Sequence, residues 1–249
     1  MPLLEDKVAI VTGAATGIGE GVARLFADEG AHVYVLDLNG AGACAVASSI
    51  GESGGSALWF ESDVRRPETV RPAVDDAIQR FGRVDILINN AGIYPRQRFL
   101  DMTERQWDEM QDVNIKGVFH CTKLVLPHMV RQNFGHIVNI SSVTFHIGSL
   151  NLSHYVASKG AIIGLTRTLA REVGEYGVHV NCITPGAVKT ESESRIATQA
   201  QVDEVVALQS LRRRILPLDI ARACLFLSCE MSDGMTGQIL NVDGGWIMH

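Results

Sequence analysis

The protein has 249 residues, of which 46% are hydrophobic and 20% charged, a balance typical of globular chains that excludes a disordered one. Its formal net charge of −6 gives no basic field for nucleic acid or an anionic membrane. No run approaches the roughly 18 apolar residues of a membrane span. Five cysteines without a C-x-x-C pair, and an acidic start unlike a signal peptide, predict a cytoplasmic protein with reduced thiols.

Short apolar runs alternate with longer helical patterns along the chain, as in βαβ units. The expected strands are Lys7–Thr12, Ala31–Asp37, Ala57–Glu61, Val84–Asn89, His136–Ile140, His179–Ile183 and Gln238–Val242. The expected helices are Gly17–Glu29, Gly40–Ile50, Pro67–Phe81, Thr103–Arg131 with a possible break, Ser153–Tyr176, a piece within Glu191–Gln209, and Pro217–Cys229. This order predicts an α/β fold: a doubly wound, Rossmann-like sheet of about seven parallel strands with helices on both faces. No repeat or linker interrupts it, so residues 1–249 are expected to form a single domain.

The first expected strand runs into a glycine-rich turn, Thr-Gly-Ala-Ala-Thr-Gly-Ile-Gly, at residues 12–19. Bare backbone N–H groups and the dipole of the following helix favour a pyrophosphate at such a turn. The spacing G-x-x-x-G-x-G departs from the G-x-G-x-x-G fingerprint of dinucleotide-binding folds. The position between a strand and a helix still predicts a phosphate-binding turn.

Asp37 ends the second expected strand, where a carboxylate can accept hydrogen bonds from both ribose hydroxyls of an adenosine. The alternative, that Asp37 only ends a strand, loses weight because the glycine turn stands in register with it. A carboxylate also repels a 2′-phosphate, and residues 14–16 and 38–39 carry no cation to neutralise one. The sequence therefore favours NAD over NADP.

The candidate catalytic residues are Ser142, Tyr155 and Lys159. Tyr155 and Lys159 stand four residues apart on an expected helix and therefore share a face. A nearby ammonium is expected to lower the pKa of a tyrosine, which suits general acid–base chemistry. A Tyr-x-x-x-Lys pair alone is usually a surface feature. Here it accompanies the glycine turn and Asn-Asn-Ala-Gly at residues 89–92, after the fourth expected strand, where open α/β sheets bind ligands.

Residues 186–215 are the one irregular stretch of the chain, rich in Glu, Ser, Thr and Gln and ending in Arg212 to Arg214. A segment of this length with a weak pattern, close to a ligand site, is typical of an active-site lid. We therefore expect a substrate lid at about 186–215.

Together these motifs resemble the classical short-chain dehydrogenase/reductase family over essentially the whole chain, and the glycine spacing is that family's own. The resemblance implies a nicotinamide dinucleotide held by one set of residues. These cofactor contacts are Gly13, Thr16, Gly17, Ile18, Gly19, Asp37, Asp63, Val64, Asn90, Ala91, Gly92, Tyr155, Lys159, Pro185, Gly186, Val188 and Thr190. Asn89 is expected to be structural instead.

The resemblance also implies a catalytic tetrad of Asn114, Ser142, Tyr155 and Lys159. In the family the asparagine supports a water linked to the lysine, which completes a proton relay. The resemblance further implies a homotetramer built on helices 112–131 and 153–176 and on the C-terminal strand region. No paired histidine spacing predicts a metal.

We therefore expect an oxidoreductase that transfers hydride between NAD(H) and a secondary alcohol or ketone. Apolar side chains after the expected fourth and fifth strands favour a small aromatic or alicyclic substrate. The expected substrate contacts are Ser142, Tyr155, Tyr94, Phe145 and Leu152. The runs at 93–95 and 243–245 also resemble family members that act on alcohols such as 1-phenylethanol or on pyridoxal-type rings.

Two alternatives stay open. 3-Oxoacyl-acyl-carrier-protein reductases share these motifs, and the arginines 212–214 would then meet an acidic carrier protein. Most of that group use NADPH, which Asp37 disfavours, and the triple arginine is better explained as the solvated end of the lid. The second alternative is a nucleotide-binding protein without catalysis, which would be expected to have lost tetrad residues, whereas all four are present.

Overall fold

The computed structural model describes residues 2–194 and 198–248. Within them seven parallel strands form one sheet in the order β3-β2-β1-β4-β5-β6-β7. The strands are β1 (Val8–Thr12), β2 (His32–Asp37), β3 (Ser56–Glu61), β4 (Ile86–Asn89), β5 (Gly135–Ile140), β6 (Val178–Pro185) and β7 (Ile239–Val242). The order reverses between β1 and β4, which is where doubly wound sheets bind their ligands. The predicted fold class is confirmed.

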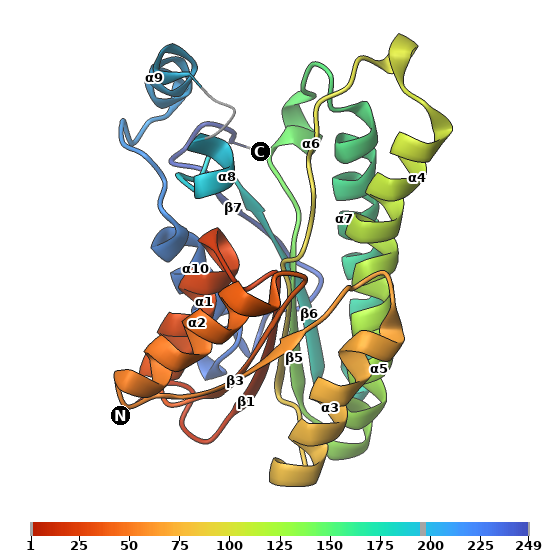
Figure 1. The fold of residues 1–249 in the computed structure, drawn as a ribbon, viewed down its shortest axis with the longest axis vertical. Coiled ribbons are helices and arrows are strands. Elements are labelled where there is room, and N and C mark those ends of the chain that lie inside the picture. Colours follow the sequence, from red (N-terminus) through yellow and green to blue (C-terminus); the bar gives the residue numbers. More distant parts are fainter. Residues whose placement is uncertain (1, 195–197, 249) are drawn as a thin grey trace.

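Helices cover both faces of the sheet, as Figure 1 shows. One face carries α1 (Gly17–Asp28), α2 (Gly40–Glu52) and α10 (Pro217–Phe226). The other carries α3 (Pro67–Phe81), α5 (Gly117–Gln132) and α7 (Ser153–Val173). Along β1, Ala9 and Val11 pack toward the first layer and Val8 and Ile10 toward the second. Because both faces are buried, the strand shows no alternation of apolar and polar residues.

The expected helix Thr103–Arg131 is broken in the structure. It consists of α4 (Glu104–Gln111), a π-helical turn η2 (Asp112–Lys116) and α5. The Gly117 N–H bonds the carbonyl of Asp112, five residues back, where an α-helix would bond four back. Thr103, where the expected helix begins, is the N-cap of α4 and forms a capping box with Gln106. Such π turns are frequent at functional sites.

The segment after β5 holds an element that periodicity did not reveal, whereas the segment after β6 was expected to hold a helical piece within Glu191–Gln209. A single helical turn, α6 (Thr144–Ile147), follows β5. The expected lid contains α8 (Glu191–Ser194) and α9 (Gln199–Leu208), while its residues 195–197 lie outside the described ranges. Two expected helices end three residues early: the 3₁₀ turn η3 (Gly174–Tyr176) replaces the end of Ser153–Tyr176, and Pro217–Cys229 ends at Phe226, before the 3₁₀ turn η4 (Glu230–Ser232). No helix in the described ranges combines the length and apolarity that crossing a bilayer requires.

Candidate active site

The glycine turn between β1 and α1 is packed too tightly for side chains. Gly13 and Gly17 have φ values of +64° and +61°, in the left-handed region that favours glycine. A Cβ on Gly19 would lie 2.2 Å from the Gly13 carbonyl oxygen, and one on Gly13 would lie 2.7 Å from Cα of Ala91. The turn therefore presents bare backbone at the N-terminus of α1, which is what a pyrophosphate requires.

Two polar side chains hold this turn in place. Asn90 Nδ2 donates to two carbonyl oxygens of the turn at 3.0 and 2.9 Å. Asp37 Oδ2 accepts the Ala15 N–H at 2.9 Å, and its Oδ1 accepts the Asn39 N–H at 2.8 Å. The carboxylate thus lies beside the turn at the carboxyl end of β2, where the sequence predicted it to meet a ribose. These features fit a dinucleotide along this edge of the sheet.

The other expected cofactor residues follow the same edge. Thr190 lies against the turn, because a Cβ added to Gly17 would lie 3.2 Å from Thr190 Cγ2. The Thr16 hydroxyl forms no capping hydrogen bond to the described part of α1. The rest are Ile18 on α1, Val64 beside Gly117, Ala91 and Gly92 after β4, Pro185 and Gly186 at the end of β6, and Val188, which bridges to Ile215.

Asp63 brings a partner that sequence reasoning missed. Arg65 Nε donates to both carboxylate oxygens of Asp63, at 2.9 and 3.0 Å. The hydrogen bond from Arg65 holds the pKa of the Asp63 carboxyl below its usual range, which outweighs the opposing effect of burial. The acid-x-base spacing could have signalled this pair. Arg65 therefore fixes the orientation of a carboxylate that the resemblance assigns to the adenine.

Ser142, Tyr155 and Lys159 meet where β5 ends against α7. The Ser142 side chain is hydrogen-bonded to Tyr155 and also accepts the Thr144 hydroxyl at 3.0 Å. The Lys159 ammonium lies over the Tyr155 ring, 5.5 Å from its centroid, and donates to the Ile140 carbonyl at 2.8 Å. The structure therefore brings the predicted serine, tyrosine and lysine together.

Burial dominates the titration of the pair. It raises the pKa of Tyr155 to about 12, against the opposing hydrogen bond from Ser142. It also lowers the pKa of Lys159 to about 8, against the opposing effect of Cys182. The pKa of Tyr155 is raised and not lowered as expected, because desolvation outweighs any stabilisation by the Lys159 ammonium, which is bonded to a backbone carbonyl. The Tyr155 hydroxyl is therefore protonated at neutral pH.

Asn114 lies buried in the π turn and fixes the segment after β4. Its Oδ1 accepts the Ile93 N–H at 2.9 Å, while Nδ2 donates to the Ile93 carbonyl and to Ser158 Oγ, each at 3.0 Å. A Cβ on Gly92 would lie 3.2 Å from Asn114 Oδ1 and 3.6 Å from Lys159 Nζ. The amide and the ammonium therefore converge on one small space beside Gly92.

Asn89 plays the structural role expected of it. Its Nδ2 donates to Asn139 Oδ1 at 2.8 Å, and Asn139 in turn donates to Thr166 Oγ1 at 3.0 Å. All three side chains are buried, so this network joins β4, β5 and α7 beneath the site.

The expected substrate contacts divide into two groups. Tyr94 faces Tyr155, the expected catalytic tyrosine, with 6.1 Å between the two ring centroids. Phe145 packs against α7, since a Cβ on Gly160 would lie 2.7 Å from its ring, and 44% of the residue remains exposed. Leu152 is buried at the start of α7. Across the described ranges, no group of three or more potential ligands is placed to hold a metal.

The fold and site define a Rossmann-type oxidoreductase, and comparisons with known proteins narrow the class. Residues 13–247 match the family described as enoyl-(acyl carrier protein) reductase. The chain is 35% identical to 3-oxoacyl-acyl-carrier-protein reductase FabG of Thermotoga maritima, covering 98% of this chain and 99% of FabG. It is 37% identical to the probable galactose dehydrogenase GalD of Rhizobium meliloti, covering 98% and 96%.

A solved structure resembles the chain along its whole length. It is a 7α-hydroxysteroid dehydrogenase complexed with NADH and 7-oxo glycochenodeoxycholic acid, with a TM-score of 0.94, 35% identity, and coverage of 99% of this chain and 96% of that one. The chain therefore belongs to the classical short-chain dehydrogenase/reductase family. It is an oxidoreductase of that family, and its cofactor is a nicotinamide dinucleotide.

Proposed function

We propose that the protein is an NAD-dependent alcohol dehydrogenase or ketone reductase that acts on a secondary alcohol or ketone with a small aromatic or alicyclic body. The observation that carries this proposal is the cluster of Ser142, Tyr155 and Lys159: a hydrogen-bonded serine–tyrosine pair with a buried ammonium over the tyrosine ring. It offers a proton donor and an oxygen-orienting hydroxyl beside the edge of the sheet where the dinucleotide fits.

The preference for NAD is supported by the Asp37 carboxylate. Both of its oxygens accept backbone N–H groups, which fixes the carboxylate at the position expected for the adenosine ribose. A 2′-phosphate at that position would meet this negative charge.

The catalytic roles follow from the protonation states. In ketone reduction Tyr155 donates its hydroxyl proton to the carbonyl oxygen, and in alcohol oxidation the same oxygen takes the proton back. Ser142 donates a hydrogen bond that orients the reacting oxygen, and Lys159 stabilises the phenolate left after transfer. The bound nicotinamide supplies or accepts the hydride at the reacting carbon. The space beside Gly92, between Asn114 and Lys159, suits a water that returns a proton to the pair.

The substrate class is supported by the apolar surroundings. Tyr94 offers a ring beside the reacting tyrosine, while Phe145 and Leu150 leave apolar surface exposed in the segment after Ser142. The ligand of the hydroxysteroid dehydrogenase neighbour is an alicyclic ketone. An aromatic or alicyclic body would cover such surface.

Reduction of a 3-oxoacyl thioester with NADPH is the second candidate, because the Thermotoga relative bears that activity in its name. The arginines expected to meet an acidic carrier protein argue against it. Arg213 is paired with Asp219 at 2.8 Å and Arg214 with Glu193 at 2.8 Å, so two of the three charges are already engaged.

We also propose that the chain is a single domain that works as a cytoplasmic homotetramer, with residues 186–215 acting as its lid. Exposed apolar side chains support both the assembly and the lid. Phe119 on α5 is exposed where subunits would pack, and Leu208 and Leu211 are exposed in the segment that would close over a substrate. Analytical ultracentrifugation tests the assembly.

Turnover measurements with Tyr155→Phe test the function. A panel of secondary alcohols, ketones and a 3-oxoacyl thioester is assayed with NAD(H) and with NADP(H). We expect turnover of an aromatic or alicyclic substrate with NAD(H), and a loss of at least about a thousandfold in Tyr155→Phe with NADH binding unchanged. Tyr176→Phe is the matched control, because Tyr176 lies beyond the end of α7. NADPH-dependent thioester reduction would replace the proposal with the second candidate.

A further inference from the structure

A second cavity lies behind the active site, on the other side of the segment that follows β4. It has a volume of about 210 Å³ and is lined by Ile93 and residues 95–97, by α4 (Glu104–Gln111) and by His154 of α7. The Tyr94 ring faces Tyr155, whereas its neighbours Ile93 and Pro95 line the cavity. The segment is therefore a wall with the catalytic tyrosine on one side and this cavity on the other.

His154 is the buried polar group in this cavity. Only 1% of its surface is exposed, and neither ring nitrogen has a hydrogen-bond partner within the described ranges. Burial also lowers the pKa of His154, so the ring is neutral at pH 7 and carries one N–H donor. An imidazole left without a partner in the interior costs free energy that a ligand with an acceptor oxygen would recover.

The charges on the cavity wall favour an anion. Arg96 and Arg105 line it together with Glu109, which leaves one net positive charge. Arg96 donates to the Leu150 carbonyl at 3.2 Å, whereas the Arg105 guanidinium forms no ion pair or hydrogen bond with any residue in the described ranges. An exposed guanidinium in this position is available to bind a carboxylate in bidentate fashion.

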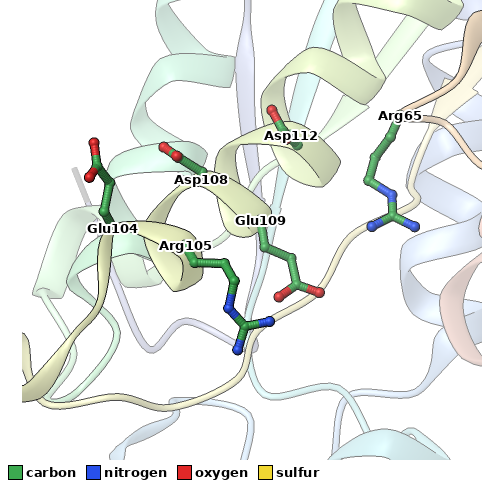
Figure 2. Close-up of a pocket in the computed structure, with 6 residues that line it drawn as sticks. All are labelled: Arg65, Glu104, Arg105, Asp108, Glu109 and Asp112. Atoms are coloured by element: carbon green, nitrogen blue, oxygen red, sulfur yellow. The ribbon is translucent and has the colours of Figure 1, made fainter.

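The neighbouring depression on α4 limits where such an anion can bind. Figure 2 shows Arg105 and Glu109 extending from one side of α4 while Glu104 and Asp108 extend from another. The depression drawn there is lined by four carboxylates, and its second cation, Arg65, is already bonded to Asp63. Negative charge disfavours an anion on that surface, so the cavity beside residues 93–97 is the better site.

We propose that this cavity is a second ligand site, for a small organic carboxylate with an apolar body. The carboxylate binds the Arg105 guanidinium and accepts the His154 N–H, while the apolar body lies against Ile93 and Pro95. The volume accommodates a single aromatic ring with its carboxylate. Because Asn114 holds both the N–H and the carbonyl of Ile93, an occupant of the cavity presses on the segment that a tetrad residue fixes.

Calorimetric titration of the purified protein with sodium benzoate tests the proposal, with the neutral isostere benzamide as the ligand control. We expect one benzoate per chain, with binding at least tenfold weaker for benzamide and in Arg105→Gln. His154→Phe keeps a ring in place but removes the N–H, and is expected to weaken benzoate binding at least fivefold. Arg98→Gln, the same charge change on a residue that does not line the cavity, leaves it within twofold.

Benzoate binding in the second cavity must be distinguished from benzoate binding in the active site. Tyr155→Phe leaves benzoate affinity unchanged if the ligand occupies the second cavity, and weakens it if the ligand occupies the catalytic site. Equal affinity in wild type, Arg105→Gln and His154→Phe overturns the proposal, as does the absence of binding up to about 50 mM benzoate. None of these readings needs turnover, so they stand or fall independently of the proposed function.

Discussion

The two sides of the site are constructed differently. On the dinucleotide side, polar groups already have their partners: Asp37 and Asn90 bond the backbone of the glycine turn and its surroundings. On the proposed substrate side, apolar surface lies open: Leu150 is 87% exposed, Leu211 59% and Phe145 44%. The first side is organised before any ligand binds, whereas the second is completed by what covers it.

This contrast explains how relatives with different names share one scaffold. FabG of Thermotoga maritima and GalD of Rhizobium meliloti are 35% and 37% identical to this chain over 98% of it. A preorganised dinucleotide side tolerates little change, because its groups bond one another. Exposed side chains in the segment after β5 and in the proposed lid can change without breaking a bond, so the proposed substrate side is free to vary.

The largest effect is expected at the most constrained point of the dinucleotide side. Gly19→Ala places a methyl group 2.2 Å from the Gly13 carbonyl oxygen and 2.6 Å from Asn90 Nδ2, so the turn must open. We expect kcat/KM to fall by about a thousandfold or more, about 4 kcal/mol, through lost dinucleotide binding. Fluorescence titration with NADH measures the lost dinucleotide binding.

Gly51→Ala is the matched control for that substitution. Nothing lies within 4 Å of a Cβ at Gly51 on α2, so this variant should keep its NADH affinity and gain up to about 1 kcal/mol of stability. Normal NADH binding by Gly19→Ala would show that the dinucleotide side is not preorganised and would remove the contrast.

Asp37→Asn tests whether the dinucleotide side also determines the choice between NAD and NADP. The amide keeps an acceptor for the turn but loses the charge that repels a 2′-phosphate. We expect the ratio of kcat/KM for NAD over that for NADP to fall by about thirtyfold. Asp28→Asn, at the exposed far end of α1, should leave the ratio unchanged. A ratio equal in Asp37→Asn and wild type would contradict the proposed NAD preference.

Acidification tests the sheet beneath both sides. Burial lowers the pKa of His136 on β5 to about 4, with a smaller contribution from the stacked ring of His179; Lys7 acts in the same direction and Asp233 in the opposite one. The pKa of His136 in the folded protein lies below the unfolded value of 6.5, so protons bind more readily to the unfolded chain. The stability that neutral His136 contributes is therefore complete above pH 6.5 and is lost as the pH falls toward 4.

We expect the free energy of unfolding to fall by about 1.4 kcal/mol more in wild type than in His136→Phe between pH 7 and pH 5.5. Urea denaturation at the two pH values measures it. Equal losses in both proteins would locate the acid-sensitive group elsewhere.

The smallest effect is expected on the substrate side. Leu150→Ser changes a side chain that is 87% exposed, so stability should stay within about 0.5 kcal/mol. The KM for an aromatic alcohol is expected to rise about threefold, because the apolar contact with its body is lost. Leu3→Ser, an exposed leucine near the N-terminus, is the control for KM. A KM unchanged in Leu150→Ser would remove this segment from the substrate side.

The sheet could be predicted from sequence because both of its faces are buried. Runs such as Val8–Thr12 are apolar at every position but the last, and the glycines and carboxylates that follow them mark the edge where ligands bind. Strand bounds still shifted by one or two residues, as at β4, which begins at Ile86 where Val84 was expected. Ladder hydrogen bonds set those bounds, and side-chain pattern does not record them.

The site was predicted less completely, for physical reasons that lie in tertiary contacts. Helical spacing put Tyr155 and Lys159 on one face, but the desolvation that raises the pKa of the tyrosine comes from surrounding chain segments. The position of Phe145 depends on α6, a single turn too short for a periodic signal, and on the room that Gly160 leaves for its ring. Neither contact is encoded by local spacing.

The π turn at Asp112–Lys116 has a consequence for comparing sequences in this family. The turn inserts one extra residue into the helix, and that residue rotates everything after it by about 100° relative to an uninterrupted α-helix. A one-residue gap placed here in an alignment would thus exchange buried side chains of α5 for exposed ones along four turns. The extra residue of the π turn determines the direction in which Asn114 points. An insertion or deletion between α4 and α5 would therefore change which side chains of α5 are buried.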